Sequence, residues 1–335
     1  MLEENRIPIL LISSLFFAAP NVFATDSDGG LTQCIQEMIV NSASSATVGE
    51  IKQACYERTG LDTNIEADVF NDAKQQTQLE RRLESEKLAF DNEFLIATHK
   101  PNYILLFARN EQTNEAPFAL QFPDEDTSLD DTEVKFQISA KFPLSRNVFG
   151  KGVLYFAYTN RSFWQLYNEN SAPFRETNHE PEIFLTLPTD WELSGFKNSF
   201  INLGFVHQSN GRAGELSRSW NRIYANFIIE KGNGLLSFKP WYRIEEDAAD
   251  DNNPDIEDYM GHFELSGLYN LRRHSLGFML RNNLKSDNRG AIQIDWMFPL
   301  TSVFHGYVQY FNGYGESLID YNYDQESIGI GLALT

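Results

Sequence analysis

A histidine and a serine two positions apart, His207 and Ser209, are the residues best suited to chemistry, and Asn221 follows them in the chain. A serine hydroxyl becomes an effective nucleophile when a neighbouring imidazole takes its proton, and a third group must hold that imidazole in one tautomer and orientation. Asparagine serves as this third group in papain-like sites. The three residues therefore fit nucleophilic acyl transfer. A His-x-Ser tripeptide alone, however, more often makes ordinary interfacial hydrogen bonds.

The alternation of apolar and polar residues predicts which way these side chains point. His207 and Ser209 share one face of a predicted strand with three apolar residues, namely Ile201, Leu203 and Phe205. In the next predicted strand, Asn221 shares a face with the apolar row that begins at Ile223. A side chain on one antiparallel strand can reach an i, i+2 pair on its neighbour. We therefore expect the three polar residues to project together from an apolar, lipid-facing surface.

Strands of this kind must position the three residues. Segments such as 134–142 and 292–296 alternate without an error, and about twelve comparable segments follow residue 102. Short turns, such as 231–234 and 271–273, alternate with long polar links. Sorting of loops into a short end and a long end is typical of outer-membrane barrels, and a soluble sandwich has no reason to show it. The sequence therefore predicts an all-β fold, a twelve-stranded antiparallel transmembrane β-barrel.

The composition agrees with this fold class. With 42% hydrophobic residues the chain is too apolar for wholesale disorder, and its longest apolar run, 7–20, is too short for a membrane-spanning helix. The formal charge of -20, without a cluster of Lys and Arg, excludes a protein that binds nucleic-acid phosphates over a broad face. The 26 Phe, 14 Tyr and 5 Trp suit the two aromatic girdles of a membrane barrel.

Two segments precede the barrel, which we assign to 96–335. Residues 1–24 have the apolar core and small cleavage-site residues of a signal peptide, although acidic residues outnumber basic ones at the start, and a buried N-terminal helix is the alternative. Residues 25–95 are helix-prone and highly charged, which predicts a periplasmic N-terminal extension. We expect the helix of this extension to be solvated, and contact with a partner is the alternative.

The chain has two cysteines, Cys34 and Cys55. In an exported protein the oxidising compartment favours a disulfide between them, and closing a loop of about 22 residues would stabilise the fold by roughly 3 kcal/mol. Two unrelated thiols are the alternative. Neither cysteine has the surroundings of a nucleophile, and no pair of Cys or His residues has the spacing of a zinc site.

The residues around the candidate triad also resemble a known family. The stretches 206–212 and 217–222 are similar to the active-site signature of outer membrane phospholipase A. The resemblance covers about residues 88 to 334, and several further stretches follow in the same order: 163–166, 173–178, 239–242, 253–255 and 313–322.

This resemblance implies a twelve-stranded barrel in the outer membrane of a Gram-negative bacterium, with its active site on the side of the external leaflet. It implies a calcium-dependent phospholipase that hydrolyses acyl esters at either glycerol position, with A1 and A2 activity, and that is active as a homodimer. By position, Ser209 is the nucleophile, His207 the general base and Asn221 the orienting group.

The resemblance also implies an oxyanion donor and a set of calcium ligands. Gly211 would offer its backbone N–H to the oxyanion. The carbonyl oxygen of Arg212 and the hydroxyl of Ser217 would bind Ca²⁺, together with Ser171 from the second subunit. Hydroxyl and carbonyl oxygens are ligands that Ca²⁺ accepts, and the ion can polarise a developing oxyanion.

The alternative function is that of an outer-membrane porin or small-solute channel. A channel needs its distinctive polar residues in the lumen, whereas the parity of the strands directs the candidate triad towards lipid. The inward residues Arg175, Glu176 and Arg222 are expected to form a salt-bridge network that fills a narrow lumen rather than to contact substrate. A third possibility, an inert scaffold that uses the N-terminal helix as an adaptor, requires a broken triad.

Overall fold

The computed structural model describes Cys34, Glu37, Ala54, Cys55 and Arg58, and residues 97–334 apart from 124–126, 170–172, 190, 194 and 302–303. The chain divides into two compact units, 1–76 and 77–335. In the first, a disulfide joins Cys34 to Cys55, whose Cα atoms lie 5.7 Å apart. The signal peptide predicted over 1–24 and most of the predicted extension lie outside the described residues.

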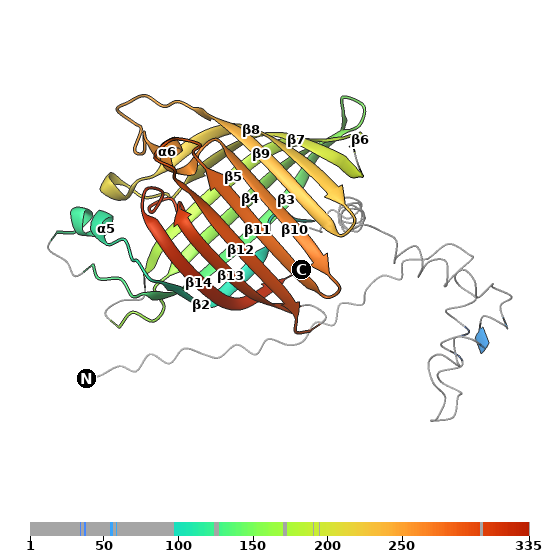
Figure 1. Ribbon diagram of the computed structural model, residues 1–335, viewed down its shortest axis with the longest axis horizontal. Helices are drawn as coiled ribbons and strands as arrows, with labels where there is room; N and C mark the ends of the chain where they lie inside the picture. The colour runs from blue at the N-terminus through green and yellow to red at the C-terminus, as the bar shows by residue number, and fades with distance from the viewer. Residues whose placement is uncertain are drawn as a thin grey trace, which may run out of the picture. The chain divides into compact units, whose positions relative to one another are not determined.

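The second unit is a closed barrel of twelve long antiparallel strands (Figure 1), as the sequence predicts. Each long strand pairs with the next one along the chain, and the last pairs with the first, so that the ring closes. Within the described residues, no helix is long and apolar enough to cross a membrane. The long strands are β2 (Asn102–Asn110), β3 (Thr132–Val148), β4 (Gly152–Trp164), β5 (Phe174–Pro188), β7 (Phe196–Ser209), β8 (Ser219–Lys231), β9 (Gly234–Ile244), β10 (Phe263–Leu271), β11 (His274–Asn282), β12 (Gly290–Pro299), β13 (Phe304–Tyr314) and β14 (Asp324–Leu334).

The links between strands differ at the two ends of the barrel. At one end the turns are short, as between β8 and β9 and between β10 and β11. At the other end the links are longer and carry the short helices α5 (Ala116–Gln121), η1 (Gly214–Leu216) and α6 (Ile256–Met260). Two further short strands, β1 (Ala97–Thr98) and β6 (Glu192–Leu193), pair with β3 and β7. The candidate triad lies towards the long-loop end, where β7 finishes and β8 begins.

Alternation along each strand separates an apolar outer face from a polar lumen. In β7, Leu203 and Phe205 are 46% and 38% exposed, whereas Val206 between Phe205 and His207 is 1% exposed. Arg222 in β8 faces inward and is buried, as its parity predicts. Strands with period-two patterning fold in this way because successive side chains point to opposite faces of the sheet.

Ion pairs cross the lumen. Both nitrogen ends of the buried Arg175 guanidinium are bound, one to Glu133 at 2.9 Å and the other to Asp320 at 2.7 Å. The Lys135 ammonium lies 2.7 Å from a carboxylate oxygen of Glu316. Burial by itself raises the pKa of the Glu316 carboxyl, but Lys135, together with Ser327 and Arg175, outweighs this effect and holds the pKa below its usual range. These contacts tie β3 and β5 to the link between β13 and β14.

That link, residues 315–323, folds into the barrel. Leu318 and Ile319 are fully buried, Leu318 within an aromatic cluster that includes Trp220 and Trp241. The Glu176 carboxylate accepts a hydrogen bond from the backbone N–H of Ile319 at 3.2 Å. Inward polar residues such as Arg175 and Glu176 therefore have structural partners, as expected for a narrow barrel that is filled by side chains.

Candidate active site

The three candidate catalytic residues lie on the outer face of two neighbouring strands. His207 in β7 and Asn221 in β8 are direct register partners. Ser209 is two residues further along β7, opposite Ser219. The structure thus places the triad in the outward row that the parity of the sequence predicts.

A hydrogen bond of 2.9 Å joins His207 Nδ1 to Asn221 Oδ1. An amide oxygen only accepts, so Nδ1 carries the proton and the other ring nitrogen, Nε2, keeps its lone pair. This tautomer is the one a general base requires. No hydrogen bond joins His207 to Ser209 in the described part of the chain, and catalytic hydrogen bonds of this type often tighten only when substrate binds.

Glu246 holds the amide of Asn221 in this orientation. Asn221 Nδ2 donates to Glu246 Oε1 at 2.8 Å, which leaves Oδ1 facing His207. Glu246 is not among the site residues predicted from the sequence. The signal lies in the pairing of strands: Ile244 is the register partner of Asn221, and a residue two positions further along continues the same face.

The loop after Ser209 is shaped by the buried side chain of Asn210, which is not among the site residues predicted from the sequence. Its Nδ2 donates to the carbonyl oxygen of Leu216 at 2.7 Å, and its Oδ1 accepts from the backbone N–H of Arg218 at 3.0 Å. Gly211 follows with φ +65°, a left-handed conformation that glycine adopts without strain. Asn210 therefore fixes the course of the segment that carries Gly211 and Arg212.

The oxygens predicted to bind calcium lie in this loop. Among the described residues, no hydrogen bond outside the strand ladders is made to the Arg212 carbonyl oxygen, and the Ser217 hydroxyl accepts one from Asn252 Nδ2 at 3.2 Å. A carbonyl and a hydroxyl oxygen are a donor set that suits Ca²⁺, although two neutral ligands do not complete its coordination. Ser171, the predicted third ligand, lies outside the described residues.

Asp251, an acidic residue in the link after β9, is paired with an arginine. Both carboxylate oxygens of Asp251 accept hydrogen bonds from Arg243, at 2.7 and 2.8 Å. Asn253 Oδ1 accepts from the backbone N–H of Ser219 at 3.0 Å, which ties the link after β9 to the start of β8. Within the described residues, no cluster of three or more His, Cys, Asp or Glu side chains could hold a metal.

The long links also contact one another. The Tyr321 hydroxyl donates to Asp255 at 2.5 Å, and both burial and this carboxylate raise the pKa of the phenol. The Arg218 guanidinium lies 5.7 Å from the centre of the Tyr321 ring. These contacts join the links after β7, β9 and β13 above the long-loop end of the barrel.

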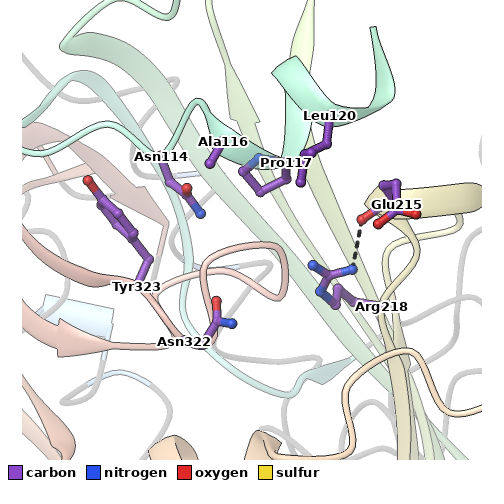
Figure 2. A pocket seen from close by; sticks show the side chains of 8 residues that line it. All are labelled: Asn114, Ala116, Pro117, Leu120, Glu215, Arg218, Asn322 and Tyr323. Carbon is purple, nitrogen blue, oxygen red and sulfur yellow. Dashed lines mark hydrogen bonds between the residues drawn. The ribbon is translucent and has the colours of Figure 1, made fainter. Parts of the chain in front are cut away.

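A cavity of about 360 Å³ lies among the links after β2, β7 and β13 (Figure 2). It is lined by residues of α5 and its preceding loop, by Glu215 and Arg218, and by Asn322 and Tyr323. Arg218, one of the lining residues, donates to the Glu215 carbonyl oxygen at 2.9 Å, the dashed line in Figure 2. No residue of the candidate triad lines this cavity, and the triad lies instead in the outward row of β7 and β8.

Comparison with known proteins places the chain in a family. Residues 79–334 match the phospholipase A1 family. Phospholipase A1 of Klebsiella pneumoniae is 41% identical over 246 residues, which cover 73% of this chain and 84% of that protein. The corresponding enzyme of Escherichia coli K12 is 40% identical over 246 residues, covering 73% and 83%.

Solved structures agree with this placement. Outer membrane phospholipase A from Escherichia coli superposes with a TM-score of 0.69 at 38% identity, covering 73% of this chain and 93% of that one. A Salmonella typhi outer membrane phospholipase, solved as a dimer with bound calcium, gives a TM-score of 0.68 at 38% identity, with 73% and 94% covered. The barrel, its outward polar cluster and these similarities lead to one conclusion: the chain belongs to the phospholipase A1 family of outer-membrane enzymes.

Proposed function

We propose that this enzyme hydrolyses the acyl esters of phospholipids at both glycerol positions, with Ser209, His207 and Asn221 as its catalytic residues. The observation that carries the proposal is the 2.9 Å hydrogen bond from His207 Nδ1 to Asn221 Oδ1 on an outward apolar face, two residues from a serine. A phospholipid in the membrane reaches such a face from the side. A water-soluble ester would have to cross hydrocarbon to do so.

In the first half of the reaction, Ser209 Oγ attacks the ester carbonyl carbon and its proton passes to His207 Nε2. The Nδ1 proton of His207 stays hydrogen-bonded to Asn221, which stabilises the imidazolium without accepting the proton. The tetrahedral intermediate then collapses. The bond between the carbonyl carbon and the glycerol oxygen breaks, the glycerol oxygen takes the proton from His207, and the lysophospholipid leaves.

In the second half, water attacks the acyl group on Ser209 and gives a proton to His207 Nε2. The bond between the acyl carbon and Ser209 Oγ breaks, and Oγ takes that proton back. A free fatty acid leaves and the enzyme is restored. Throughout, the backbone N–H of Gly211 is the proposed donor to the oxyanion.

Calcium and a second subunit complete the proposal. The Arg212 carbonyl and Ser217 hydroxyl would hold Ca²⁺ together with the partner subunit's Ser171, and the bound ion would supply positive charge beside the oxyanion. Support comes from the oxygen donor set and from the Salmonella typhi relative, which was solved as a dimer with bound calcium. Because one subunit supplies an incomplete ligand set, activity would depend on dimer formation.

The remaining assignments concern the ends of the barrel and of the chain. We propose that the long-loop end faces the outside, as in other outer-membrane barrels, which puts the triad on the side of the external leaflet. We also propose that residues 1–24 are a signal peptide and that 25–95 form a periplasmic extension before the barrel domain, 96–335.

The test is release of fatty acid from phospholipid in detergent micelles that contain Ca²⁺. The wild-type enzyme is expected to be active, and both Ser209→Ala and excess chelator are expected to abolish release. Ser145→Ala, which changes an exposed serine near the short-turn end of β3, is the matched control and should keep full activity. Full activity in Ser209→Ala, or with chelator present throughout, would contradict the mechanism.

A further inference from the structure

Ser209 lies in a row of polar residues that crosses four neighbouring strands at one height. Asn160 in β4 is the register partner of His179 in β5, and His179 is the register partner of Ser209 in β7. Ser209 in turn faces Ser219 in β8. The candidate nucleophile therefore has two histidines beside it, His207 along its own strand and His179 across the sheet. The proposed mechanism uses the first and leaves the second without a role.

The hydrogen bonds of His179 define its tautomer. The Tyr158 hydroxyl lies 2.6 Å from His179 Nδ1, and Asn160 Nδ2 lies 3.5 Å from the same nitrogen. The Ser162 hydroxyl donates to Asn160 Oδ1 at 3.0 Å, which leaves the amide nitrogen facing the ring. An amide nitrogen only donates, so His179 Nδ1 accepts and the ring proton sits on Nε2.

The protonated edge of the ring faces the loop that follows the nucleophile. A Cβ atom placed on Gly211 would lie 3.8 Å from both Nε2 and Cδ2 of His179. Gly211 is two residues beyond Ser209, and its own N–H is the proposed oxyanion donor. Preorganised donors beside the carbon under attack stabilise a tetrahedral oxyanion, and histidine side chains are among the groups that serve this purpose.

We propose that His179 is a second oxyanion donor. Its Nε2–H donates to the carbonyl oxygen of the scissile ester as negative charge develops on that oxygen. The proposal rests on the mechanism given above for Ser209. The two imidazoles then have different roles, because the Nδ1 atom of one donates a hydrogen bond and the Nδ1 atom of the other accepts one. His207 Nδ1 donates to Asn221, which leaves Nε2 free to take a proton, whereas His179 Nδ1 accepts from Tyr158, so that Nε2 can only donate. No proton is transferred at His179.

The experiment replaces His179 by phenylalanine, which keeps a ring beside Tyr158, with which His179 stacks, but removes the Nε2–H. We expect kcat to fall about 100-fold with little change in KM, because this donor meets a charge that exists only after attack. His274→Phe is the matched control, since His274 is likewise a histidine stacked on an aromatic ring, that of Trp296, and it should keep wild-type kcat. Dimer content is measured for each variant by sedimentation at the same Ca²⁺ concentration.

A second measurement separates a donor from a packing residue. An alkylboronic acid forms an anionic tetrahedral adduct on a serine, so its affinity should fall in His179→Phe by about the same factor as kcat. Tyr158→Phe, which removes one of two donors to Nδ1, should give a smaller fall in both quantities. Nitrogen chemical shifts of the wild-type ring should show the proton on Nε2 of His179.

Three outcomes would overturn the proposal: an unchanged kcat, a loss of kcat with unchanged boronic-acid affinity, and a loss of kcat that follows the loss of dimer. Failure of the proposed function looks different. In that case Ser209→Ala would retain activity, whatever the result for His179.

Discussion

The lumen and the outer face of the barrel use polar residues for opposite purposes. In the lumen, all three guanidinium nitrogens of Arg175 are bound by two buried carboxylates, Glu133 and Asp320. On the outer face, among the described residues, neither His207 Nε2 nor the Ser209 hydroxyl takes part in a hydrogen bond. In the lumen, charged side chains pair with one another and hold neighbouring segments of the chain together. Spare hydrogen-bonding capacity on an apolar surface indicates where chemistry takes place.

This difference follows from the cost of polar groups in hydrocarbon. An unpaired polar side chain on a lipid-facing surface loses its hydration without gaining a partner, so such residues are rare unless they serve a function. In the lumen, paired charges offset one another and can be retained for structure alone. The comparison predicts that substitutions in the outward polar cluster around Ser209 reduce the rate, and that substitutions of paired lumen residues reduce stability.

The largest expected effect comes from His207→Ala. Without the proposed base, kcat/KM should fall about 10⁴-fold or more, which corresponds to about 5.5 kcal/mol of transition-state stabilisation. The midpoint of thermal unfolding should stay close to that of the wild type, because no lumen contact is lost. Fatty-acid release and thermal unfolding in the same detergent provide the two measurements. A strong loss of thermal stability in His207→Ala would contradict the proposal that the outward site contributes to the rate and the lumen to stability.

An intermediate effect is expected from Arg175→Met. The substitution leaves Glu133 and Asp320 buried without their counter-ion, which should lower the free energy of unfolding by about 3–5 kcal/mol. The measurement is denaturant unfolding in detergent, with activity expressed per folded molecule. Arg109→Met is the control, because Arg109 pairs with Asp131 on the exposed surface and should lose under about 1 kcal/mol. Equal losses in the two variants would contradict the comparison.

The smallest effect on kcat/KM is expected at Glu246, which contacts the proposed triad through Asn221. Glu246→Gln keeps an acceptor for Asn221 Nδ2 but removes the charge, so kcat/KM should fall at most about tenfold, or about 1.4 kcal/mol. Glu246→Ala should lose more, because the Asn221 amide can then turn its nitrogen towards His207. Glu245→Gln, the same charge change at the adjacent exposed residue, should behave as wild type. If Glu246→Gln and Glu246→Ala had the same kcat/KM as Glu245→Gln, Glu246 would have no positioning role.

Alternation along single strands was enough to predict the barrel and the outward direction of His207 and Ser209, because this pattern is local to each strand. Asn221 was also predictable, since only a nine-residue loop, 210–218, separates β7 from β8. Asn210, Glu246 and His179 were not. Asn210 acts through the folding of that loop. Glu246 and His179 reach the site through the register of β9 against β8 and of β5 against β7, which depends on link lengths and bulges.

Residues 315–323 form the link between β13 and β14. This link is buried inside the barrel, and its Glu316 and Asp320 are paired with the lumen cations Lys135 and Arg175. A single folded segment therefore both fills central space and joins β3 and β5 to β13 and β14, so that the lumen acts as a packed core.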